Sequence, residues 1–239
     1  YELEGNILKY TEDPHWGLSC FIIVAIAKNE NHTLLYQGRL PFTRQGSMTI
    51  RIYLDGQWYY PITFVEPMYY DEEKYGYPTV YNYDRERKYI QRITYNEKER
   101  TWIHTIEPIN GEGLKLEIKG KARATFWMGE MSGPYIVHGV YSNSKNIDIW
   151  GGFWDVGTAE ITLKIPGKKE LKLKGQFLFD RAIHRSHPGV LRGAVLSFSC
   201  IYIYQENLDI MLSHSINPSP ANLPKFQHQC ILYINGKRY

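Results

Sequence analysis

Residues 171–188, LKLKGQFLFDRAIHRSHP, combine the clearest strand pattern of the chain with a dense group of ionisable side chains. Apart from Gly175, apolar side chains recur at every second position from Leu171 to Phe179, and this period of two predicts a half-buried β-strand. Asp180 follows at the expected end of the strand, and Pro188 predicts a loop. The stretch therefore predicts a strand that leads into a turn with several ionisable side chains.

Asp180 and His184 are the candidate catalytic residues of this turn. Burial raises the pKa of a carboxyl group and a neighbouring cation lowers it, so Asp180 has two ways to be tuned as an acid or a base. In this reading His184 or Arg181 orients the carboxyl group. The alternative is structural, with Asp180 capping the turn or pairing with Arg181 or Arg185. Residue types alone leave both readings open.

Composition limits the class of protein. The 239 residues are 43% hydrophobic and 22% charged, which is typical of a globular fold. A net charge of +3 without a long basic block argues against a nucleic-acid partner. The longest apolar run, residues 20–27, is too short for a transmembrane segment. Compartment and oligomeric state are not indicated, and loss of an N-terminal signal before Tyr1 stays open.

Alternating segments recur along the whole chain, separated by turn residues such as Asp55 and Gly56. About fourteen strands and almost no helix predict an all-β fold, an antiparallel barrel or sandwich. We expect a single domain over residues 1–239, with two closely packed β-subdomains as the alternative. Residues 66–88 carry many tyrosines without a clear period and are expected to form a long loop.

The histidines and cysteines do not form a metal motif. No HExxH, HxH or CxxC spacing occurs, so neither a metal nor another cofactor is expected. Cys20, Cys200 and Cys230 are far apart in apolar runs and are expected to be core thiols.

Aromatic residues make up 15% of the chain and suggest where a ligand would bind. We expect an aromatic-lined cavity bounded by residues 126–128, 135–141, 150–155 and 177–180. Its expected substrate-binding residues are Trp127, Glu130, His138, Tyr141, Trp150, Trp154, Asp155, Phe177, Phe179 and Arg181. The alternative for each tryptophan is a plain core position.

Several segments resemble lipocalin-like proteins of the carotenoid 1,2-hydratase (hydroxyneurosporene synthase) type. These are HWGLSCFIIVAIAKNENHTLLYQGRLPF (15–42), GLKLEIKG (113–120), GVYSNSKNIDIWG (139–151), LKGQFLFDRAIHR (173–185) and GAVLSFSCIYIYQENLDIML (193–212). The signature of that family maps onto Gly175, Phe179, Asp180 and Arg181 but is interrupted at residues 182–183, where Ala and Ile replace an acidic residue and Trp.

The resemblance implies a lipocalin-like barrel that holds a hydrophobic small molecule, among relatives that hydrate, isomerise or cyclise terpenoid and polyketide substrates. We therefore expect binding of an apolar ligand, with cofactor-independent hydration, isomerisation or cyclisation as a further activity. The alternative is a non-catalytic lipid- or carbohydrate-binding module. An inward-pointing ionisable group in an enclosed cavity would favour the enzyme, and a flat, exposed Trp/Tyr strip would favour the module.

Overall fold

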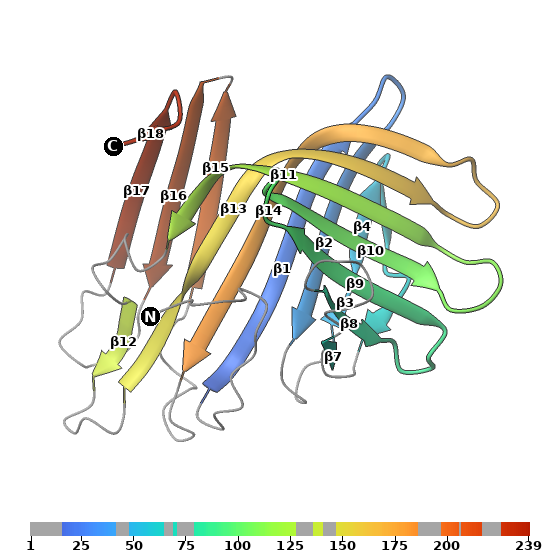
Figure 1. Ribbon diagram of the computed structural model, residues 1–239, viewed down its shortest axis with the longest axis horizontal. Coiled ribbons are helices and arrows are strands. Elements are labelled where there is room, and N and C mark those ends of the chain that lie inside the picture. Colours follow the sequence, from blue (N-terminus) through green and yellow to red (C-terminus); the bar gives the residue numbers. More distant parts are fainter. Residues whose placement is uncertain are drawn as a thin grey trace. The chain divides into compact units, whose positions relative to one another are not determined.

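A computed structural model of the chain (Figure 1) describes residues 16–41, 48–64, 69–70, 79–127, 136–140, 147–185, 197–205, 207–216 and 226–239. Every regular element among these residues is a β-strand, and every pairing given for them is antiparallel. The prediction of an all-β antiparallel fold is confirmed. Eighteen strands are present in this part of the chain, and four of them, β3, β6, β7 and β18, have only two residues.

The strands in chain order are β1 (Trp16–Lys28), β2 (Thr33–Pro41), β3 (Met48–Thr49), β4 (Arg51–Leu54), β5 (Gln57–Tyr59), β6 (Thr63–Phe64), β7 (Tyr69–Tyr70), β8 (Thr79–Tyr83), β9 (Tyr89–Asn96), β10 (Thr101–Pro108), β11 (Lys115–Trp127), β12 (Ile136–Val140), β13 (Ile147–Lys164), β14 (Leu171–Arg185), β15 (Ser197–Gln205), β16 (Leu208–Ile216), β17 (Phe226–Ile234) and β18 (Lys237–Arg238).

A twelve-stranded sheet runs in the order β5-β4-β2-β1-β14-β13-β11-β10-β9-β8-β7, with β12 paired to β13. Strands β15 to β18 form a second sheet, and β3 pairs with β6. The contacts divide the chain into two compact units. Unit 1 holds the described residues of 20–122 and 156–179, and unit 2 holds those of 12–19, 123–155 and 180–239. The expectation of one domain, with two subdomains as its alternative, stays a prediction.

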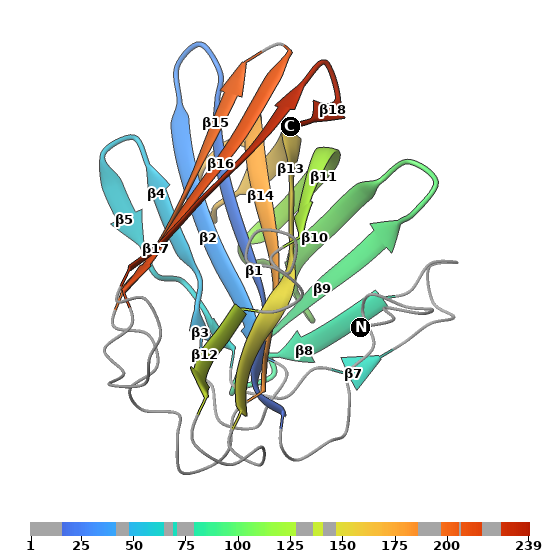
Figure 2. The same cartoon turned by 90° about the vertical axis from the view of Figure 1, so that its left-hand side faces the viewer.

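The large sheet curls strongly within unit 1. Strands β2 and β10 are five positions apart in the sheet, so a flat sheet would separate them by about 24 Å. Instead the hydroxyl of Tyr36 on β2 lies 2.7 Å from Nε2 of His104 on β10. Strands β8 to β10 therefore face β2 across the interior of unit 1. Figure 2 shows β9 and β10 at an angle to β2.

Local sequence explains the hairpins that were predicted correctly. Asp55 and Gly56 have φ angles of 51° and 87°, the left-handed values that a tight hairpin turn between β4 and β5 requires. Strands β1 and β2, and likewise β9 and β10, are consecutive antiparallel partners and form two further hairpins. Gly175 on β14 is needed for close packing, because a Cβ atom there would lie 1.9 Å from the backbone oxygen of Ile26 on β1.

Three expectations are wrong. Residues 66–88 are not one long loop, because β7 and β8 form there and β8 pairs along its length with β9. Asp180 does not lie at a strand end, because β14 continues to Arg185. Cys230 is exposed rather than a core thiol. In the first two cases a neighbouring strand supplies the hydrogen-bond partners, so pairing overrides local composition.

Candidate functional site

A buried tyrosine–histidine pair is the most distinctive polar feature of unit 1. Tyr36 and His104 are 0% and 1% exposed, and the Tyr36 hydroxyl lies 2.7 Å from His104 Nε2. Gly38 makes room for this arrangement, because a Cβ atom at that position would lie 2.2 Å from the Tyr36 hydroxyl oxygen. A polar pair is thus held in the interior by strands β2 and β10.

Burial keeps both members of the pair uncharged at neutral pH. It lowers the pKa of His104 to about 3 and raises the pKa of Tyr36 far above its ordinary value. The backbone of Arg92 raises the pKa of the imidazole, but by less than burial lowers it. Nδ1 has no well-aligned hydrogen bond within the described part of the chain. The hydrogen bond between the Tyr36 hydroxyl and Nε2 can run in either direction, depending on which ring nitrogen carries the proton.

Gln91 on β9 lies close to this pair and is itself fully buried. It lies opposite Ile106 of β10, and its neighbour Ile93 lies opposite His104, so Gln91 and His104 are diagonal neighbours on the inward face. Among the residues that the structure describes, neither its amide nitrogen nor its amide oxygen has a hydrogen-bond partner. Leaving such a group buried and unpaired costs about 1–3 kcal/mol of stability.

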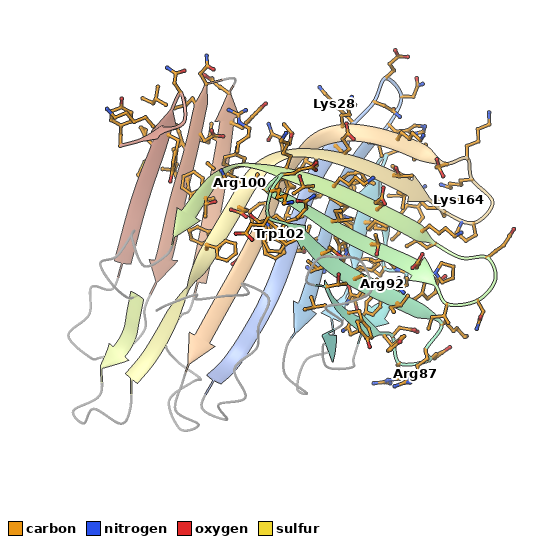
Figure 3. All side chains as sticks on the ribbon, in the orientation of Figure 1. Lys28, Arg87, Arg92, Arg100, Trp102 and Lys164 are labelled. Carbon is orange, nitrogen blue, oxygen red and sulfur yellow. The ribbon has the colours of Figure 1, made fainter. Side chains whose placement is uncertain are left out.

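Aromatic side chains surround the polar group. The ring of Trp102, which is 2% exposed, stacks on Phe179 with 3.6 Å between the ring centroids and 12° between the planes. Phe177 covers Gly120, where a Cβ atom would come within 2.6 Å of its ring. Figure 3 labels Trp102 within the dense group of side chains beside the curved strands. The inward face of unit 1 therefore combines large apolar surface with few polar groups.

The expected site residues belong to both units. Phe177 and Phe179 are buried in unit 1. The other expected residues that are described lie in unit 2, where Trp154, Asp155 and Asp180 are also buried. Thr125 donates a hydrogen bond of 2.5 Å to Asp155.

The side chains of the remaining expected residues lie outside the described part of the chain. Five lie on described strands, although their side chains are outside the described part: Trp127 (β11), His138 (β12), Trp150 (β13), Arg181 and His184 (β14). Glu130 and Tyr141 lie outside the described residues. The expected cavity and the roles of these residues therefore stay predictions.

Sequence reasoning missed Tyr36, Gln91 and His104. A signal was present, because each is a polar residue at an inward position of a strand, within LLYQG, YIQRI and WIHTI respectively. Nothing in the sequence brings the three together, since they come from β2, β9 and β10 and meet only because the sheet curls.

A second polar group joins β11 to the small sheet of unit 2. Asp209 accepts hydrogen bonds from the Tyr202 hydroxyl at 2.5 Å and from Arg123 Nη2 at 3.3 Å. Arg123 also donates to the backbone oxygen of Gln205 and lies over the ring of Tyr204, 4.3 Å from its centroid. The polar groups of this cluster are hydrogen-bonded to one another, so we interpret the cluster as a structural clamp.

The outward face of unit 1 carries an exposed aromatic strip formed by Tyr53, Trp58 and Tyr60. Trp58 and Tyr60 are 50% and 59% exposed, and their rings are nearly parallel, with 16° between the planes and 6.1 Å between the centroids. Tyr53 lies opposite Trp58 in the register, with 5.0 Å between their rings. An exposed Trp/Tyr strip is the feature expected of a carbohydrate-binding module.

The described residues lack both a metal-binding cluster and a membrane-spanning helix. They contain no group of three or more His, Cys, Asp and Glu side chains arranged to hold a metal ion. Within the same ranges, no helix has the length and apolarity needed to cross a membrane.

The described part of unit 1 is thus a curled antiparallel sheet with a mainly apolar inward face. No family profile and no curated protein matches the sequence. Among solved structures the chain is similar to CghA, with a TM-score of 0.50 and 12% identity over 92% of this chain and 58% of CghA. It is also similar to CghA crystallised with Sch210972 (TM-score 0.51, 12% identity, 92% of this chain and 58% of that one).

A third similar structure is described as an AttH from Nitrosomonas europaea, with a TM-score of 0.53 and 8% identity over 98% of this chain and 73% of that one. At these identities the likeness shows the fold alone, which is that of lipocalin-like β-barrel proteins. The chain spans 58% of the length of CghA.

Proposed function

We propose that the protein binds an apolar small molecule, of terpenoid- or polyketide-like character, on the inward face of unit 1. The observation that carries the proposal is the fully buried Gln91 amide beside the neutral Tyr36–His104 pair on a mainly apolar face. Ligand sites are mainly apolar and contain a few polar groups that orient the ligand. The aromatic rings of Trp102 and Phe179 supply the apolar part.

The fold likeness supports this proposal, since CghA has been crystallised with Sch210972. From the resemblance of the sequence to proteins of the carotenoid 1,2-hydratase type, we also propose a cofactor-independent hydration, isomerisation or cyclisation. Asp180 and His184, which both belong to unit 2, are the proposed acid–base pair of that activity.

The first experiment is a titration with N-phenyl-1-naphthylamine, an uncharged dye whose fluorescence rises in an apolar site, followed by mass spectrometry of solvent extracts of the purified protein. We expect saturable binding that is weakened by Ile106→Phe, because Ile106 is buried on the inward face next to His104. Thr105→Phe is the matched control, since Thr105 points to the other face of β10. Equal effects of the two substitutions would contradict binding on the inward face.

A second candidate function is carbohydrate binding at the exposed aromatic strip. Flat, exposed rings stack on the apolar faces of sugar rings, and Trp58 and Tyr60 present such surfaces side by side. Retardation in gels containing soluble polysaccharides would test it. Trp58→Ala should abolish retardation, whereas Tyr239→Ala, at another exposed ring elsewhere in the chain, should not. Unchanged retardation of the Trp58 variant would exclude the strip.

A further inference from the structure

We propose that Gln91 selects a ligand that presents a neutral hydrogen-bond donor and acceptor side by side, as a carboxamide does. This inference rests on the proposed function, because it specifies which polar group of the ligand enters the inward face of unit 1. It would exclude carboxylate ligands and would disfavour ligands that carry only an acceptor.

The amide of Gln91 sets this requirement. Its NH2 group offers two donors and its oxygen accepts up to two hydrogen bonds. Both atoms are fully buried and have no partner among the described residues, so each needs a complementary atom of opposite type. A carboxamide matches both atoms at once. A ketone or ester satisfies only the NH2 group and leaves the amide oxygen unpaired, which weakens its binding.

The surroundings of Gln91 also require that the ligand group beside it be uncharged. Its directly opposite neighbours are Ile106 of β10 and Asn82 of β8, and neither carries a charge. The His104 ring on the diagonal is engaged through Nε2 by the Tyr36 hydroxyl and is neutral at pH 7. A carboxylate would enter without a counter-ion and would lose its hydration, which is costly in an apolar environment.

Asn82 places a second buried amide next to Gln91. Asn82 is 0% exposed and lies directly opposite Gln91 in the β8–β9 register, so two amide side chains share one part of the inward face. Ile93 and Val80, the next pair along these strands, are also 0% exposed. A ligand amide therefore meets polar groups at one end of this region and apolar side chains next to it.

The test is a competition experiment against N-phenyl-1-naphthylamine with three naphthalenes that differ in one group. These are 2-naphthamide, which has a donor and an acceptor, 2-acetylnaphthalene, which has only an acceptor, and 2-naphthoate, which is anionic. We expect 2-naphthamide to compete at least about tenfold better than 2-acetylnaphthalene, and 2-naphthoate to be the weakest.

Gln91→Leu should remove the preference for the amide while the dye still binds. Gln37→Leu makes the same chemical change at an exposed position of β2 and should keep the preference. Gln91→Met serves as a second variant if the leucine variant does not fold. A preference that survives in the folded Gln91 variant, or that is missing from the unmodified protein although the dye binds, overturns this inference and leaves ligand binding intact. Absence of dye binding overturns the proposed function itself.

A second measurement does not need a ligand. An apolar residue removes the unpaired amide, so Gln91→Leu should raise the melting temperature, while Gln37→Leu should not. A lower melting temperature of the folded Gln91→Leu protein would mean that the amide is already satisfied, for example by a bound water molecule. That result would overturn the inference.

Discussion

The buried imidazole of His104 should make the stability of the protein strongly dependent on pH. Its pKa is about 3 in the folded state and 6.5 as the ordinary value. Between these values the unfolded chain binds a proton and the folded chain does not, so stability falls as the pH falls through this window. Above pH 6.5 both states are neutral and the stability is fully present.

The magnitude follows from the two pKa values. Each pH unit between the two pKa values lowers the free energy of unfolding by about 1.4 kcal/mol. Lowering the pH from 7.0 to 4.5 should therefore reduce it by about 3 kcal/mol through His104 alone. The groups that face the ring do not supply a compensating charge. Tyr36 stays neutral, and Ile93 and Ile118, which flank His104 on β9 and β11, are apolar.

The assay is urea denaturation at pH 7.0 and 4.5 for the unmodified protein and for Tyr36→Phe/His104→Phe. The double variant removes the titrating group and its hydroxyl partner together, so neither is left buried without a hydrogen bond. Other carboxylates and histidines contribute equally to both proteins. We expect the unmodified protein to lose about 3 kcal/mol more than the double variant. Equal losses would refute the assignment of a neutral, desolvated His104.

Three further changes test other parts of the structure. Gly175→Ala should prevent close packing of β14 on β1 and lower the melting temperature strongly. Gly167→Ala, in open space at a φ of 76°, should lower the stability by only about 1 kcal/mol. Similar melting temperatures of the two variants would contradict the close approach of β14 to β1. Asp209→Ala should lower the free energy of unfolding by about 1–3 kcal/mol in urea, because it removes the carboxylate partner of Arg123, and no loss would mean that the clamp is not structural. If Asp180 is the proposed catalytic acid, Asp180→Asn should reduce turnover of an identified substrate by ~100-fold with little change in melting temperature, and the reverse pattern would make it structural.

The sequence alone determined the fold class. Alternation with a period of two depends only on which side chains face the apolar interior, so it is visible in the chain itself. Turn residues such as Asp55 and Gly56 fixed hairpins for the same local reason, because few residues adopt the left-handed φ values that the turn needs. The inward positions of Phe177 and Phe179 were also readable from the alternation.

Strand ends and the polar interior were decided by tertiary structure. Strand β8 exists because β9 supplies its hydrogen-bond partners, although its tyrosine-rich sequence resembles a loop. Strand β14 runs past Asp180 to Arg185, which the polar sequence did not indicate. Tyr36 and His104 are 68 residues apart in the chain, and only the curl of the sheet brings a hydroxyl and an imidazole to 2.7 Å. Such contacts depend on how a sheet closes, and this property is set by all its strands together rather than by any segment of sequence.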